Sequence, residues 1–475
     1  MSLTSGRFSW LTVVAISASL AAGCSKSGLE SSFVYSAKTD SLIPEAQSGI
    51  KGQAGVKKMV DDRFGNPQHL KAWSKLPIDF GGVTASVGET PSGKAVKEIL
   101  LQFEEGITSP SGDAVSSVQF VGGAAAGETA AVLSWDAESG KATLVSALTG
   151  SPAQGDQVVI GGGEVIRNGR VLYQRHCSHC HGTSGDGAGP TAEYLNPRPR
   201  DYRHGVFKFT STNSSSKASR EDLSRILKYG IPGTYMPSFL LLKDDELYAI
   251  VEYVRFLAMR GEFERKLVTE LSVDYSKASV ADQTASGTKR SEIIEALTAF
   301  LTEDFSDVAN SAGDELAEAW STADTEEALV APTVGRVADS PESRRRGREL
   351  YLSKCADCHG VSGEGNGPQT TIFEKLPDAD ALYPEAGLHD EWGNVTKPRN
   401  LTQGIYRGGR RPIDLFCRMN EGIKGTKMPA FKTVFSNEDV WHIVNYVLSI
   451  PFEAEPGVSP GSIAPATPVA PAAAE

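Results

Sequence analysis

Two stretches of the sequence share one skeleton. They are "RHCSHCHGTSGDGAGP" at residues 175–190 and "SKCADCHGVSGEGNGP" at residues 353–368. In each, two cysteines three positions apart are followed at once by a histidine, and then by glycines and a proline. Further blocks repeat downstream in the same order, "PRDYRHGVF" with "PRNLTQGIY" and "EDLSRILKYGIPGTYMPSF" with "IDLFCRMNEGIKGTKMPAF". The chain therefore contains an internal duplication in which each copy is one structural unit.

The cysteines of each copy suit covalent attachment of a haem. Cys177 and Cys180 are one helical turn apart and point the same way, as two thioether bonds to the vinyl groups of one haem require. His181 follows directly and can place its imidazole on the iron. In the second copy the same roles fall to Cys355, Cys358 and His359.

Three other interpretations of the cysteine motif stay open on sequence alone. A structural zinc site needs four ligands, so each copy would have to recruit one more. A thioredoxin-like redox pair needs no histidine after it and opens a helix behind a strand. A disulfide between cysteines three apart is the third. The repetition and the export signal described below favour haem.

A methionine in each copy is the candidate for the second axial ligand. Met236 and Met428 each precede a proline in the glycine-bounded loops "GIPGTYMPSF" and "GIKGTKMPAF". Pro237 and Pro429 would stiffen these loops. Since both methionines lie at equivalent loop positions rather than on helical stripes, the sequence predicts His181 with Met236 and His359 with Met428 as axial pairs.

Because it contains these motifs, each copy resembles a class I c-type cytochrome domain. The resemblance covers the C-x-x-C-H helix, the G-T-x-M-P loop and a C-terminal helix, "DELYAIVEYVRFLA" or "EDVWHIVNYVLSI". The tandem resembles bacterial dihaem cytochromes of respiratory chains. It implies a mainly α fold with two covalently bound haems, one domain at 163–261 and the other at 342–450. The resemblance does not reach the residues before about 163.

The resemblance also implies supporting residues around each haem. In the family a proline carbonyl after the motif accepts the imidazole N–H, and Pro190 and Pro368 are the matching candidates. Arg200 and Arg399, in the repeated "PR", are candidates for pairing with haem propionates. Solvated surface arginines are the alternative for this pair.

Residues 1–24 read as an export signal. Arg7 precedes the apolar run "FSWLTVVAISASLAAGC", which is too short to span a bilayer comfortably and ends in small residues. Its end resembles a bacterial lipobox, although Ala21 stands where leucine is usual. We expect lipidation of Cys24 and attachment to the periplasmic side of a membrane; an ordinary cleaved signal is the alternative. Cys417 is the one cysteine left over, and we expect it to be buried as a small hydrophobe.

The remaining segments predict smaller structures. Residues 25–162 contain a polar tether to about residue 67, then the strand-like runs "VSSVQFVGG", "TAAVLSW" and "KATLVSAL", which predict a small β-meander or hairpin module. Residues 262–341 predict an acidic helical connector. Residues 451–475, rich in proline and alanine, predict a disordered tail.

The function expected is single-electron relay through two closed haem sites in a respiratory chain. The net charge of −12 argues against nucleic acid as a partner. Redox partner proteins are expected instead: a quinol-oxidising complex, a terminal oxidase or a dehydrogenase. Two alternatives are a dihaem cytochrome c peroxidase, which would have to open one haem, and the cytochrome subunit of a periplasmic dehydrogenase.

Overall fold

The structure is a computed structural model, and it describes residues 32–50, 54–68, 70–71, 73, 75–89, 96–105, 109, 117–126, 128–161, 164–377 and 379–452. The predicted export signal with Cys24 and all but the first two residues of the predicted tail lie outside these residues. No helix in the described ranges is both long and apolar enough to cross a membrane.

The first copy is a bundle of helices, and its two longest helices are the first and the last of the copy. Its elements are α5 (Glu164–His176), α6 (Ser178–His181), η2 (Ala192–Tyr194), η3 (Tyr202–His204), α7 (Arg220–Tyr229) and α8 (Asp244–Tyr275). The second copy repeats this order with α12 (Pro341–Lys354), α13 (Ala356–His359), η5 (Pro368–Thr371), η6 (Leu401–Gln403), α14 (Pro412–Glu421), α15 (Asn437–Ser449) and η7 (Ile450–Phe452). The two copies are therefore matching helical domains.

In each copy the first helix crosses the last one at a glycine. A Cβ on Gly169 would lie 2.0 Å from the carbonyl oxygen of Ala249, and one on Gly347 would lie 2.0 Å from that of His442. Only glycine lets the backbones approach this closely. Edge-to-face tyrosine pairs flank both crossings, with ring centroids 5.2 Å apart for Tyr173 and Tyr253 and 5.3 Å apart in the second copy. These crossings fix the helix ends that carry the cysteine motifs.

The connector is helical, as predicted, and it packs on the first copy. Helix α8 continues past residue 261, where the sequence placed the domain boundary, and is followed by α9 (Lys277–Ala285), α10 (Arg290–Glu303), α11 (Phe305–Thr322) and η4 (Glu326–Ala328). Ile293, Leu297 and Leu301 form one buried stripe on α10. The boundary is not visible in the sequence because the helical pattern does not break there.

The expected tether is wrong from residue 32 onward. That segment forms α2 (Ala37–Ser41), α3 (Pro44–Ser48) and α4 (Val56–Phe64). Phe33, Leu42, Val60 and Phe64 are buried in the same core as α8. The apolar residues of this segment come in short groups among polar ones, so its composition suggests a tether. Because these apolar residues are buried against α8, the segment is part of the fold.

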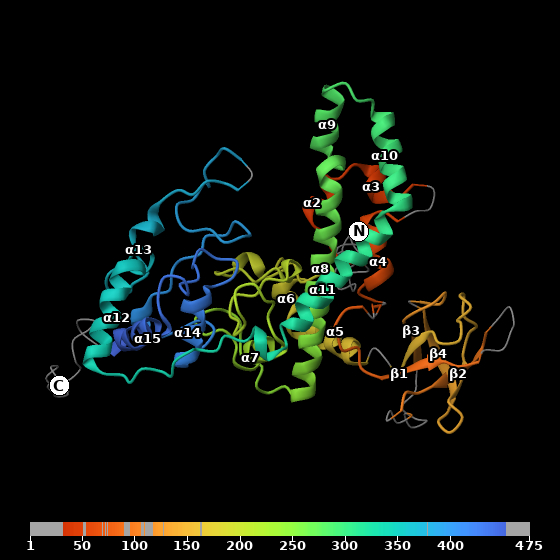
Figure 1. Ribbon diagram of the computed structural model, residues 1–475, viewed down its shortest axis with the longest axis horizontal. Coiled ribbons are helices and arrows are strands. Elements are labelled where there is room, and N and C mark those ends of the chain that lie inside the picture. The colour runs from red at the N-terminus through yellow and green to blue at the C-terminus, as the bar shows by residue number, and fades with distance from the viewer. Residues whose placement is uncertain are drawn as a thin grey trace, which may run out of the picture.

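The β module is a closed barrel rather than an open meander. Its strands are β1 (Val83–Val87), β2 (Glu98–Gln102), β3 (Ser117–Phe120), β4 (Thr129–Asp136), β5 (Lys141–Leu144) and β6 (Gln157–Ile160). Their order is β1-β2-β5-β4-β3-β6, and antiparallel pairing of β1 with β6 closes the ring. The barrel has its own core, which includes Val87, Phe120 and Val158. In Figure 1 it lies at one end of the molecule, with the second copy at the other end and the first between them.

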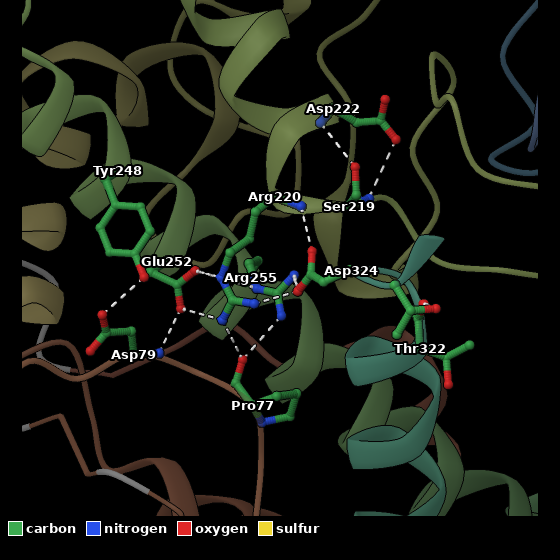
Figure 2. Close-up of polar contacts among 11 residues, drawn as sticks. Pro77, Asp79, Ser219, Arg220, Asp222, Tyr248, Glu252, Arg255, Thr322 and Asp324 are labelled. Carbon is green, nitrogen blue, oxygen red and sulfur yellow. Dashed lines mark hydrogen bonds and ion pairs between the residues drawn. The ribbon is translucent and has the colours of Figure 1, made fainter. Parts of the chain in front are cut away.

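A buried polar network joins three parts of the chain around α8 (Figure 2). Glu252 and Arg255 of α8 are fully buried. The guanidinium of Arg220 donates to Glu252 Oε1 (2.6 Å), contacts Asp324 and donates to the carbonyl of Pro77 (2.9 Å). This pairing satisfies charges that burial would otherwise penalise, and it fixes the N-terminal segment and the connector to the first copy.

The two copies pack against each other about an approximate two-fold relation. A Cβ on Gly233, in the Met236 loop, would lie 3.2 Å from Ile405 Cγ2, and one on Gly425, in the Met428 loop, would lie 3.2 Å from Val206 Cγ1. Gly233 matches Gly425 in the repeat alignment and Val206 matches Ile405, so the same contact occurs twice with the copies exchanged. The two methionine loops therefore lie at the interface between the copies.

Candidate functional site

The cysteine motifs lie where one helix ends and a single helical turn follows it. Cys177 separates α5 from α6, and Cys355 separates α12 from α13. The histidine amides of both motifs donate to the carbonyl of the first cysteine at 2.9 Å. A tyrosine hydroxyl donates a hydrogen bond to the end of each turn. The hydroxyl of Tyr173 donates to the carbonyl of Gly182 (2.8 Å), and that of Tyr351 donates to the carbonyl of Gly360 (2.7 Å). The two motifs thus have one geometry.

Each motif histidine is oriented by a backbone carbonyl, but not by the one expected. His181 Nδ1 lies 3.1 Å from the carbonyl oxygen of Arg200, and His359 Nδ1 lies 3.2 Å from that of Arg399. The expectation for Pro190 and Pro368 is wrong, since the Nδ1 atoms are paired with the Arg200 and Arg399 carbonyls instead. The glycine-rich loop carries each proline to the surface, while the repeated "PR" segment passes beside the imidazole. Because Nδ1 is bonded to the carbonyl, Nε2 remains free to bind a metal.

Both histidines are partly buried, and this favours the neutral form of their imidazoles. Burial lowers the pKa of His181 to about 4, although the Arg200 carbonyl opposes the shift. The pKa of His359 is lowered for the same reason. Neutral imidazole is the form that ligates a metal.

The two methionine loops are built identically. In the first, the Thr234 hydroxyl donates to the carbonyl of Ile231 (2.8 Å) and accepts from the Met236 amide (3.1 Å). In the second, Thr426 makes the same bonds to Ile423 (2.7 Å) and Met428 (3.2 Å). Gly233 and Gly425 have φ of +75° and +71°, which explains the glycine that the sequence places there.

In the first copy these parts meet around one cavity. It has a volume of about 460 Å³, and Cys177, Cys180, His181 and Met236 all line it. The rest of the lining is largely apolar and includes Leu195, Phe207, Leu223, Leu227, Val251 and Val254. The structure thus brings the four predicted haem-binding side chains of this copy together in a cofactor-sized pocket.

The thiols do not match the other interpretations of the motif. The five cysteines of the described residues are free, so neither motif forms a disulfide. Burial raises the pKa of Cys177 and of Cys355 to about 12, the opposite of a reactive thioredoxin-like thiolate. No group of three or more His, Cys, Asp or Glu side chains converges as a metal cluster within the described residues. Cys417 is buried, as predicted.

The two arginines of the "PR" segments have different surroundings. Arg399 donates to the carbonyl of Ile405 (2.8 Å) and to Gln403 Oε1 (3.0 Å). Arg200 lines the cavity, and its Nη2 is buried without a hydrogen-bond partner among the described residues. Burial lowers its pKa to about 10. The solvated-surface alternative is therefore wrong for Arg200.

Three residues at the first site escaped sequence analysis. Tyr202 stacks on the His181 imidazole with ring centroids 4.6 Å apart, where the second copy has Leu401. Tyr173 could have been found, because Tyr351 stands at the same repeat position. Arg407, which belongs to the second copy, lines the cavity of the first, and no repeat pattern signals such a contact.

Comparison with known proteins agrees with the repeat analysis. The cytochrome c family model matches residues 166–258 and 345–451. The two matches support a tandem c-type cytochrome, and cytochrome c domains imply covalently bound c-type haem and haem-based electron transfer. Among curated protein sequences there is no match.

The solved structures include one that is similar over part of the chain. It is the Kuenenia stuttgartiensis reducing HAO-like protein complex, at 22% sequence identity and a TM-score of 0.41. The alignment covers 60% of this chain and 97% of that one.

Proposed function

We propose that the protein is a dihaem electron carrier that works outside the cytoplasm, with one haem in each copy held between a histidine and a methionine. The observation that carries the proposal is the repetition of both ligand-bearing structures, the C-x-x-C-H turn and the G-T-x-M-P loop, down to their hydrogen bonds. A peroxidase needs one open haem, and two identical methionine loops count against that alternative.

The chain's residues fit a c-type haem, and each has a definite task. A bound haem would supply the one-electron couple of its iron. Cys177 and Cys180 would hold the first haem covalently, and Cys355 and Cys358 the second. The carbonyls of Arg200 and Arg399 orient the imidazoles, and buried side chains such as Leu227 and Val254 exclude water from the first cavity. Met236 and Met428 would supply thioether ligands, which favour reduced iron and so a high potential.

The cellular context is part of the proposal. The export signal supports a periplasmic location, and lipidation of Cys24 would attach the protein to a membrane surface. The partners would be a quinol-oxidising complex or dehydrogenase as donor and a terminal oxidase as acceptor. Cys24→Ser should move the protein from the membrane fraction to the soluble periplasmic fraction, whereas Ser25→Ala should not.

An optical redox titration of the haem-loaded protein, followed by carbon monoxide, tests the central claim. Two low-spin haems with the weak long-wavelength band of ferric iron bound to methionine sulfur, and no carbon monoxide binding, are expected. Met236→Leu and Met428→Leu should each open one haem to carbon monoxide. Met419→Leu, a partly buried methionine outside the loop, is the matched control and should bind none. A high-spin haem in the unaltered protein would favour the peroxidase instead.

A further inference from the structure

The second copy contains an insertion that reaches the first haem site. Residues 369–397 stand where the first copy has only residues 191–198. The insertion contains the turn 390–394, closed by Asp390 Oδ1, which accepts from the amides of Trp392 (3.1 Å) and Asn394 (3.0 Å). This turn holds the Trp392 indole at the interface between the copies.

Trp392 lies between Arg200 and the Met428 loop. The Arg200 guanidinium carbon is 3.7 Å from the centroid of the indole. A Cβ on Gly425 would be 2.7 Å from an indole carbon, and the amide of Glu391 donates to the Gly425 carbonyl (3.3 Å). The indole thus contacts the segment that orients His181 and the loop that carries Met428.

The insertion breaks the two-fold relation at this point. In the matching place Arg399 itself lies against the Met236 loop, 3.0 Å from the position of a Cβ on Gly233. Gln403 accepts a hydrogen bond from Arg399, whereas the matching residue of the first copy, His204, lies against Trp392 with ring centroids 5.0 Å apart. Trp392 therefore lies against the Met428 loop at the position where the two-fold relation would place Arg200.

Two donors are left without partners as a result. Arg200 Nη2 and Trp392 Nε1 are both buried, and neither has a hydrogen-bond partner among the described residues. Arg200, with Arg198 and Lys208, lines both the haem cavity and a smaller cavity of about 170 Å³, and Trp392 lines the smaller one. Burying such donors is costly unless an acceptor reaches them.

The three carboxylates that line the smaller cavity already have partners. Asp201 forms a two-point pair with Arg203 at 3.0 and 2.8 Å. Asp390 closes its own turn and lies 3.7 Å from Lys208 Nζ. Asp186 caps the amide of Ala188 (3.2 Å). The two unpartnered donors are therefore suited to an additional anion, and a haem carries carboxylates of its own.

We propose that Trp392, supplied by the second copy, completes with Arg200 the binding site for a propionate of the first haem. This deepens the proposed function and rests on it, since it presupposes haem in the first cavity. The second domain then contributes directly to the electrostatics of the first haem, through Trp392 at the propionate and Arg407 in the cavity lining. In the second copy the Arg399 guanidinium donates instead to the Ile405 carbonyl and to Gln403.

The test is the reduction potential of each haem in Trp392→Phe, which keeps an aromatic ring at this position and removes the indole N–H together with the five-membered ring that carries it. Met236→His and Met428→His assign the two waves, since each should lower the potential of its own haem. Losing a donor leaves the propionate charge less compensated, which favours ferric iron. The first haem's redox equilibrium should therefore shift toward the oxidised form by roughly threefold to tenfold, about 30 to 60 mV at 59 mV per tenfold.

Controls separate this inference from the proposed function. Trp441→Phe removes an indole N–H that donates to the carbonyl of Val334 (3.2 Å) in the second copy, and it should leave the first potential unchanged. If the protein binds two His/Met haems and Trp392→Phe does not move the first wave, Trp392 is only a stacking residue and the inference is wrong. If the first domain holds no haem, the proposed function itself fails.

Discussion

At the scale of single residues, the four candidate haem-binding side chains that line the first cavity were predictable, and the groups that support them were not. Thioether attachment of a haem would account for the spacing of Cys177 and Cys180, and the following His181 is part of the same signature. The carbonyl that orients His181 depends on the path of a loop, and it belongs to Arg200 rather than Pro190. A local motif fixes the first kind of residue, whereas the second needs the tertiary structure.

Tyr202 should contribute to the stability of the first haem domain. Its ring is buried between His181 and Phe207, stacked on both. We expect Tyr202→Leu, which copies Leu401 of the second repeat, to lower the free energy of unfolding by about 1–3 kcal/mol. Urea unfolding followed at the haem band would measure it. Tyr194→Leu, an exposed tyrosine of the same segment, should change it by less than about 0.5 kcal/mol. Equal effects of the two would contradict the assignment.

His204 should make stability depend on pH. Burial, reinforced by the charge of Arg265, lowers its pKa to about 4. The unfolded chain takes up this proton near pH 6.5 and the folded chain only near 4, so the stabilisation is present above pH 6.5 and is lost as the pH falls between these values. The slope from this group is at most about 1.4 kcal/mol per pH unit.

Unfolding midpoints from pH 7 to 4 would measure this slope. His204→Gln should flatten the fall in stability, whereas His179→Gln, at an exposed position, should leave it as it is. If the two variants give the same curve, the acid sensitivity does not come from His204.

At the scale of elements, a strong hydrophobic periodicity in the sequence predicted a helix correctly, whereas short groups of apolar residues did not reveal the helices that they form. The stripe on α10 was predictable from its helical spacing, and its members are buried. Helices α2, α3 and α4 have too few apolar residues to stand out, and only their packing on α8 explains them. The barrel strands β3, β4 and β5 were predictable one by one, but the pairing of β1 with β6 that closes the ring joins segments far apart in the sequence.

The glycine at the first helix crossing should be intolerant of a side chain. A Cβ at Gly169 would meet the Ala249 carbonyl at 2.0 Å, so Gly169→Ala must push α5 away from α8. We expect a loss of about 1–3 kcal/mol in unfolding free energy, despite the better helix propensity of alanine. Thermal unfolding of the haem-loaded protein is the measurement. Gly335→Ala, where nothing lies within 4 Å of the new atom, is the control. A neutral Gly169→Ala would mean that the helices can separate freely.

At the scale of the whole molecule, the barrel should be separable from the haem domains. Its core is distinct from the one around α8. The chain enters and leaves it at neighbouring points, since a Cβ on Gly81 would lie 2.8 Å from Val165 Cγ2. Replacing residues 82–163 by two glycines should therefore preserve two haems per chain and the absorption spectrum. The haem-to-protein ratio of this variant is the measurement. Loss of either haem would show that the barrel supports the haem domains.

The arrangement of the copies could not be predicted, although their existence could. Sequence repetition identifies two equivalent units, but it contains no signal for how they pack. Trp392 is an example, because it belongs to an insertion that has no counterpart in the first repeat. Its role depends on contacts with Arg200 and Gly425, which the sequence does not predict.

The paired contacts Gly233–Ile405 and Gly425–Val206 also have an evolutionary consequence. An interface in which each half repeats the other is what remains when the gene of a self-associating ancestor is duplicated and fused. In such an ancestor, two copies of one chain would have met through their methionine loops and would have been identical in structure. Fusion would release the copies from that identity, and the insertion carrying Trp392 is where they now differ, so the two halves of the molecule are no longer interchangeable.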